Sequence, residues 1–159
     1  MDNEQLYTDF ITELDRNTFL RIGQSLVPNS GFKKDECEVI IKTDEEVRHE
    51  YLTKIDHKLD SLLYKQEQLL LKINDLTIEN NTTLENMKKL KAKINNKGSI
   101  ISFITLYLNK EDLENQHKHN EETEKYCNVF VIITQLHEEV LEIEEQIKNT
   151  KNVKELLLL

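Results

Sequence analysis

Histidine side chains are the first groups in this sequence that could bind a metal ion. His117 and His119 form a His-x-His pair among several glutamates. On a helix, side chains two positions apart point about 200° apart, so this pair is poorly placed to chelate one ion. His49 and His57 lie two helical turns apart, which is too far for a shared ligand shell. We therefore interpret the histidines as solvated and predict no metal ion or other cofactor.

The sequence also lacks a recognisable arrangement for catalysis. Cys37 and Cys127 have no local histidine and acid of the kind that activates a nucleophile, and we predict that both are reduced and buried. The three glycines lie far apart, so no glycine-rich phosphate loop is possible. Paired glutamates at 138–139 and 144–145 fit the outer face of a helix, with no pocket to shift their pKa values. We predict a non-enzymatic protein without a small-molecule substrate.

Charge and hydropathy narrow the class of partner. The 159 residues include 30 acidic and 21 basic side chains, for a formal net charge of −9. This sign repels phosphate backbones, so we predict protein partners and no direct nucleic-acid binding. The acidic N-terminus does not resemble a signal peptide. The apolar runs at 100–108 and 129–133 are shorter than the roughly 20 residues that span a bilayer. We expect an intracellular protein without membrane insertion.

Composition and turn signals predict the fold class. The chain has three glycines, one proline and no tryptophan, with 32% charged residues, which is typical of long amphipathic helices. Breaks fall at 28–31 and at 95–99. We predict an all-α protein of segmented long helices that form a coiled coil or an elongated helical bundle. Its parts are an amphipathic helix at 1–28, a linker at 29–42, a long heptad helix at 43–97, a short apolar helix at 98–109, and a heptad helix with an apolar tail at 110–159.

Local patterns support the first two helices. Leu6, Phe10 and Leu14 are four residues apart and share one helical face. Thr43 and Glu46 fit a capping box, in which the hydroxyl and the carboxylate each accept a hydrogen bond from an exposed backbone amide. We predict that the central helix begins there, or slightly earlier if the apolar run at 39–41 is already helical.

The central helix has the clearest periodicity. Steps of three and four residues define a seam with ten apolar positions out of thirteen, formed by Leu52, Ile55, Leu59, Leu62, Gln66, Leu69, Ile73, Leu76, Asn80, Thr83, Met87, Leu90 and Ile94. A repeat that averages 3.5 residues predicts a left-handed coiled coil. At about 1.5 Å per residue the helix would be about 80 Å long, so its seam needs another chain or the later helix folded back.

Three polar residues interrupt this seam. Gln66, Asn80 and Thr83 could be tolerated in an imperfect coil. Alternatively, they could fix register and partner, because a polar seam residue costs stability unless the facing helix satisfies it. The sequence leaves both interpretations open.

The last helix is predicted at about 110–148. Its first part, 113–123, is polar and is expected to be poorly anchored, and the tail at 156–159 is expected to be an exposed apolar end. Its second part has heptads that we predict to contact partner chains, formed by Tyr126, Val129, Ile133, Leu136, Val140, Ile143 and Ile147. Neighbouring apolar residues broaden this stripe, as in a helix of a three- or four-helix bundle.

Three local patterns resemble the C-terminal coiled-coil domain of the central-channel nucleoporins, the sixty-two-kilodalton nucleoporin family. They are Leu14-Asp15-Arg16 followed by Gly23, the run 54–59 leading to Gln66-Glu67-Gln68, and the run 121–126. The family has tryptophan where this chain has Leu14, and this chain contains no Phe-Gly dipeptide. The resemblance implies a scaffold subunit at the nuclear pore that pairs with two other coiled-coil nucleoporins, without a role in binding transport receptors.

Other hypotheses remain open beside this one. A kinetochore or vesicle-tethering subunit would use the same segmented helices. A regulatory module would dock its tail, 153–159, into a partner's groove. In the scaffold hypotheses the partners are other coiled-coil proteins, and a three-stranded hetero-oligomer is one form of the assembly. Because the two long seams expose a large apolar stripe, we expect the isolated chain to be incompletely folded or self-associated.

Overall fold

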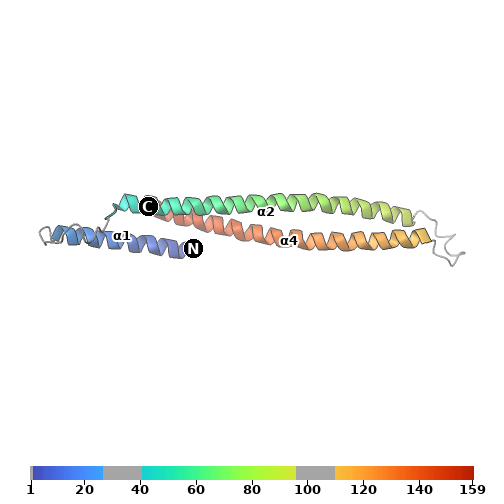
Figure 1. The fold of residues 1–159 in the computed structure, drawn as a ribbon, viewed down its shortest axis with the longest axis horizontal. Coiled ribbons are helices and arrows are strands. Elements are labelled where there is room, and N and C mark those ends of the chain that lie inside the picture. Colours follow the sequence, from blue (N-terminus) through green and yellow to red (C-terminus); the bar gives the residue numbers. More distant parts are fainter. Residues whose placement is uncertain (1, 27–40, 96–109) are drawn as a thin grey trace, which may run out of the picture. The chain divides into compact units, whose positions relative to one another are not determined.

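The computed structural model describes residues 2–26, 41–95 and 110–159. These residues form three α-helices and no strand: α1 (Asn3–Leu26), α2 (Asp44–Asn95) and α4 (Lys110–Leu158) (Figure 1). The all-α prediction is confirmed. The short apolar helix predicted at 98–109 and most of the linker predicted at 29–42, with Cys37, lie outside the described residues.

The capping box at the start of α2 is confirmed. The Thr43 backbone amide donates to Glu46 Oε2 at 2.7 Å, and the Glu46 amide donates to Thr43 Oγ1 at 3.1 Å. Each side chain thus satisfies one amide that the first helical turn leaves unpaired. The helix then runs for 52 residues to Asn95.

The chain divides into two compact units. Unit 1 contains Met1–Lys65 and Ile143–Leu159, and unit 2 contains Gln66–Glu142. Each unit therefore includes part of α2 and part of α4, and α1 belongs to unit 1.

In unit 1, α1 lies antiparallel to the first part of α2. Near its start Asn3 contacts Lys58, further along the Phe10 and Tyr51 rings have centroids 5.6 Å apart, and near its end Arg21 pairs with Asp44. The core of the unit contains apolar residues from all three helices, among them Leu6, Phe10, Val47, Tyr51, Ile55, Leu59, Ile143, Ile147 and Leu157. Burial of this apolar surface is the main force that holds the three helices together.

In unit 2, α2 and α4 pair in opposite directions. Ile73 packs with Leu136 and Val140, while further along α2 Glu79 pairs with Lys125, whose Nζ lies 3.2 Å from Glu79 Oε1. The residue numbers of the contacting side chains decrease along α4 as they increase along α2, so the two helices are antiparallel. Leu69, Leu76 and Ile133 are half-buried around this core.

Two predictions for the last helix are wrong. The helix does not end near residue 148 but continues to Leu158. In the predicted exposed tail Leu157 is buried, whereas Leu156, Leu158 and Leu159 are exposed. The stretch 113–123 is fully helical, and Asn115 within it is buried.

These predictions are wrong because the heptad repeat of α4 extends beyond its apolar residues. Continued in steps of three and four, the seam of α4 passes through further buried or half-buried positions at Asp112, Asn115, His119, Glu122, Thr150, Lys154 and Leu157.

Candidate interaction surfaces

The seam residues predicted to face partners are covered within the chain itself. All thirteen seam positions of α2 are buried or half-buried, with Ile55, Leu59, Ile73, Asn80 and Thr83 fully buried. On α4, Leu136, Val140, Ile143 and Ile147 are buried, and Tyr126, Val129 and Ile133 are half-buried. The chain itself therefore covers much of these seams, and the prediction that their residues contact partner chains stays a prediction.

A polar layer connects the three helices of unit 1. Asn3 Nδ2 donates to Thr150 Oγ1 at 3.1 Å, and Lys58 Nζ donates to Asn3 Oδ1 at 2.6 Å. The Thr150 hydroxyl is fully buried and donates to the Gln146 carbonyl at 2.7 Å. A single amide thus meets a donor and an acceptor on two other helices, which fixes the position of α1 along them.

Charged groups surround the Phe10–Tyr51 contact in unit 1. The Lys54 ammonium lies 4.3 Å from the Tyr51 ring centroid and 3.3 Å from Glu50 Oε1. Burial, with a hydrogen bond to the Glu13 carboxylate, raises the pKa of Tyr51 to about 12. A hydrogen bond from Lys42 lowers the pKa of Glu50, and the same contact raises the pKa of Lys42. This edge of α1 is therefore bound to α2 by both aromatic and ionic contacts.

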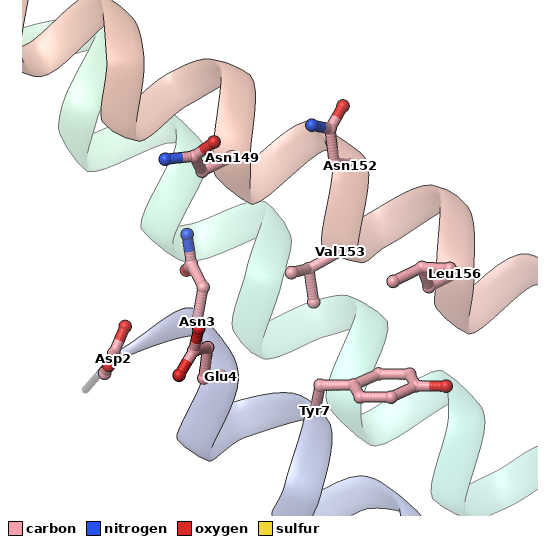
Figure 2. Close-up of a pocket in the computed structure, with 8 residues that line it drawn as sticks. All are labelled: Asp2, Asn3, Glu4, Tyr7, Asn149, Asn152, Val153 and Leu156. Atoms are coloured by element: carbon pink, nitrogen blue, oxygen red, sulfur yellow. The ribbon is translucent and has the colours of Figure 1, made fainter.

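A shallow pocket of about 410 Å³ opens between the start of α1 and the end of α4 in unit 1. Figure 2 shows Tyr7 and Glu4 on the α1 side and Val153 and Leu156 on the α4 side, with Asn149 and Asn152 above them. Its lining mixes acidic, amide and apolar groups. No buried titratable side chain among the described residues points to a reaction there, so the pocket is a surface depression between two helices.

The seam of unit 2 contains polar groups that are poorly satisfied. Asn80 is 5% exposed, and its Oδ1 is buried without a hydrogen-bond partner. Glu122 Oε2 is likewise buried without a partner. A buried acceptor that loses water and gains no donor destabilises the folded state. Within the described residues no donor reaches Asn80 Oδ1, and the interpretation that polar seam residues specify register stays a prediction.

The histidines and the described cysteine lie apart from one another. His117 is exposed and pairs with Glu121, Nε2 to Oε1 3.1 Å, whereas His119 is half-buried on the seam side. No cluster suited to a metal ion occurs within residues 2–26, 41–95 and 110–159. Cys127 is exposed, so the prediction that it is buried is wrong.

Two sides flank the seam of unit 2, and one of them is charged. We label the positions of each heptad a–g, with a and d on the seam. Lys125 and Glu79 then both occupy g positions. Because these two side chains form an ion pair, the g positions of the two helices lie on the same side of the seam. On α4 the c and g positions of this side include Glu111, Glu114, Lys118, Glu121, Lys125, Glu139 and Glu142. Ile132, 42% exposed, is the apolar exception.

The opposite side of unit 2 holds almost no charge over the same length. We call it the neutral face; it consists of the b and e positions from 70 to 84 on α2 and from 113 to 141 on α4, namely Leu70, Asn74, Thr77, Asn81, Leu84, Leu113, Gln116, Asn120, Thr123, Cys127, Phe130, Thr134, His137 and Leu141. Beyond these bounds the b and e positions of α2 in unit 2 include the charged residues Glu67, Lys88 and Lys91. Phe130 is 56% exposed, Leu141 65% and Leu70 46%. Four of the exposed large apolar side chains of unit 2 lie on this face, and four others, Leu71, Ile78, Val131 and Ile132, lie elsewhere on α2 and α4. Exposed apolar side chains on an uncharged side make it a candidate interaction surface.

Sequence analysis noted that apolar residues beside the seam broaden the stripe of α4, but it did not identify the uncharged b and e positions as one face. The signal was nevertheless present, since the b and e positions of α4 from 113 to 141 contain no Asp, Glu, Lys or Arg. In a chain with 32% charged residues, outer helix positions are expected to carry such side chains.

Comparison with known proteins gave no match to a family model, a curated protein or a solved structure. No helix in the described part of the chain is long and apolar enough to cross a membrane. The patterns that resemble the nucleoporin family lie on all three helices, with Gly23 in α1 and the run 121–126 in α4. No atom lies within 4 Å of the position of a Cβ on Gly23, so packing within the chain does not require glycine there.

Proposed function

We propose that this protein is a non-enzymatic scaffold subunit that joins other helical chains by coiled-coil packing. The neutral face of unit 2 carries the proposal. The chain closes its own seams, and Leu70, Phe130 and Leu141 then remain on a second side with apolar and amide groups but no fixed charge. A helix from another chain would bury these side chains, and each Å² of apolar surface removed from water would stabilise the complex by about 25 cal/mol.

Unit 1 provides an example of this kind of docking inside the molecule. There α1 adds a third helix beside α2 and α4, and it buries Leu6 and Phe10. In unit 2 the described residues provide only two helices. A third helix from a partner would give unit 2 the number of helices that unit 1 has.

The experiment is affinity purification of the tagged chain from its native cells, followed by mass spectrometry. We expect other coiled-coil proteins to co-purify with the natural chain and to be lost with Phe130→Lys. Ile132→Lys makes the same chemical change on the charged side and should retain them. Partners that persist with Phe130→Lys would show that the neutral face is not the binding surface.

The assembly that we propose is the central channel of the nuclear pore, with other coiled-coil nucleoporins as the partners. Only the three sequence patterns support this particular assembly, and they lie on α1, α2 and α4. The same purification tests it, because two other coiled-coil nucleoporins should appear in comparable amounts. Kinetochore or vesicle-tethering subunits in their place would leave the scaffold role standing and exclude the nuclear pore.

A further inference from the structure

We propose that a second copy of this chain occupies the neutral face of unit 2, so that two α2–α4 pairs pack face to face as a four-helix bundle. This inference rests on the proposed function, because it names the occupant of the same surface.

The charge distribution is the first argument for a second copy. Each chain has a formal net charge of −9, so two copies repel each other unless they meet where charge is absent. On the charged side of unit 2, a copy would bring residues such as Glu139 and Glu142 towards their own equivalents. On the neutral face the ionisable residues are Cys127 and His137, and the b and e positions that continue it along α2 are Glu67 at one end and Lys88 and Lys91 at the other. Two copies can therefore approach there without placing like charges together.

The composition of the face is the second argument. An uncharged face requires an uncharged partner surface, since a charged one would lose water without gaining an opposite charge. The neutral face is itself such a surface. In a two-fold dimer the same patch serves both partners, so exposed apolar side chains such as Phe130 and Leu141 would cover those of the other copy. The amides and hydroxyls of Asn74, Asn81 and Thr134 can both donate and accept, so they can hydrogen-bond to polar groups on the same face of the other copy.

The shape of the face is the third argument. Both helices of unit 2 contribute to it, with Leu70 and Leu84 from α2 and Phe130 and Leu141 from α4. A surface formed by a pair of antiparallel helices is well matched by another such pair, because the four helices then surround one apolar centre.

The test is the mass of the purified full chain in solution, measured by sedimentation equilibrium over a range of concentrations. We expect twice the 18.8 kDa mass of one chain. Phe130→Lys and Leu70→Lys should each raise the dissociation constant of the dimer by at least about tenfold. Both positions are exposed in the single chain, so circular dichroism should show unchanged helix content. The matched control, Ile132→Lys, should remain dimeric.

The thiol of Cys127 gives a second measurement on the same face. In a Cys37→Ser background, a maleimide should modify Cys127 more slowly as the protein concentration rises, because the dimer covers it. In Phe130→Lys the rate should not depend on concentration.

A natural chain that is monomeric at all concentrations would overturn this inference. So would a dimer that Phe130→Lys and Leu70→Lys leave intact, or one that Ile132→Lys disrupts equally. A monomeric chain whose cellular partners are still lost with Phe130→Lys would overturn the second copy alone and keep the proposed function. Partners that are retained would also exclude the neutral face as the binding surface on which the proposed function rests.

Discussion

Unit 1 and unit 2 both contain parts of α2 and α4, yet they differ in what accompanies those helices. In unit 1, α1 adds a third helix, and Asn3 satisfies the buried Thr150 with a hydrogen bond between helices. Both units contain buried polar atoms without a hydrogen-bond partner, Asn17 Nδ2 and Arg48 Nε in unit 1 and the acceptors of Asn80 and Glu122 in unit 2. In unit 2 an uncharged face also remains exposed. The described residues give unit 1 three helices and unit 2 two, and this difference is the basis of our proposal that a partner completes unit 2.

The largest effect is expected from shortening a core isoleucine in each unit. Ile55 in unit 1 is 1% exposed and Ile73 in unit 2 is 7% exposed. Replacement of a buried isoleucine by alanine costs about 2–5 kcal/mol, and the cost rises when the site is enclosed. We expect Ile55→Ala to lower the free energy of unfolding in urea more than Ile73→Ala does. Ile78→Ala, at a position that is 58% exposed, is the control and should change it by less than about 0.5 kcal/mol. If Ile55→Ala and Ile73→Ala lowered the free energy of unfolding equally, the expected difference between the two units would be contradicted.

Substitution of Asn3 and of Asn80 by leucine is expected to change the stability of the protein in opposite directions. Asn3→Leu removes the donor to Thr150 and the acceptor for Lys58, so it should destabilise the protein by about 1–3 kcal/mol. Asn80→Leu removes an unsatisfied buried acceptor from a seam, so it should stabilise the protein by a similar amount. Hydrogen exchange should localise the first change to α1 and the second to unit 2.

The control for these variants is Asn128→Leu, because Asn128 is exposed on the charged side of unit 2. It should leave both exchange and unfolding nearly unchanged. If Asn80→Leu destabilised unit 2, Asn80 would have a partner that specifies the register, as one interpretation of the sequence proposed.

A smaller effect is expected at alkaline pH, and it belongs to unit 1. The pKa of Tyr51 is about 12 in the folded protein against a reference of 10.0. Between about pH 10 and 12 the unfolded chain therefore loses this proton while the folded protein keeps it, so stability falls as pH rises through this window. We expect Tyr51→Phe to reduce that fall. Tyr64→Phe, at a position that is 64% exposed, should leave it unchanged. Urea unfolding at a series of pH values measures both, and an equal pH dependence in the two variants would contradict the assignment.

Much of the secondary structure could be predicted from the sequence. The Thr43–Glu46 capping box and the break after Asn95 gave the bounds of α2, because hydrogen-bonding side chains and breakers act locally. The burial of the α2 seam also follows its 3.5-residue period. The extent of α4 was missed because helix length was judged from apolar residues, and the positions Asn115, His119 and Thr150 continue the seam with polar ones.

The interaction surface could not be predicted by the same reasoning. Heptads identify what a helix buries, but they do not say whether the chain itself or a partner covers it. The contacts Glu79–Lys125 and Asp56–Lys154 join residues far apart in sequence, and they show that α4 covers α2 within each unit. Once the seams are assigned to the chain itself, the remaining uncharged side becomes the candidate surface for partners.

The central claim is that each seam is closed by helices of the same chain, and cross-linking with a carbodiimide tests it most directly. This reagent joins a carboxylate and an amine that are already in contact. Lys125 Nζ lies 3.2 Å from Glu79 Oε1 in unit 2, and Lys154 Nζ lies 2.6 Å from Asp56 Oδ1 in unit 1. The sample is a mixture of ¹⁴N- and ¹⁵N-labelled chains, and Glu79→Gln is the control that should abolish the first link. We predict that mass spectrometry will find both linked peptides with one isotope only. Linked peptides that combine the two isotopes would show that α2 pairs with the α4 of another chain, and would contradict the account.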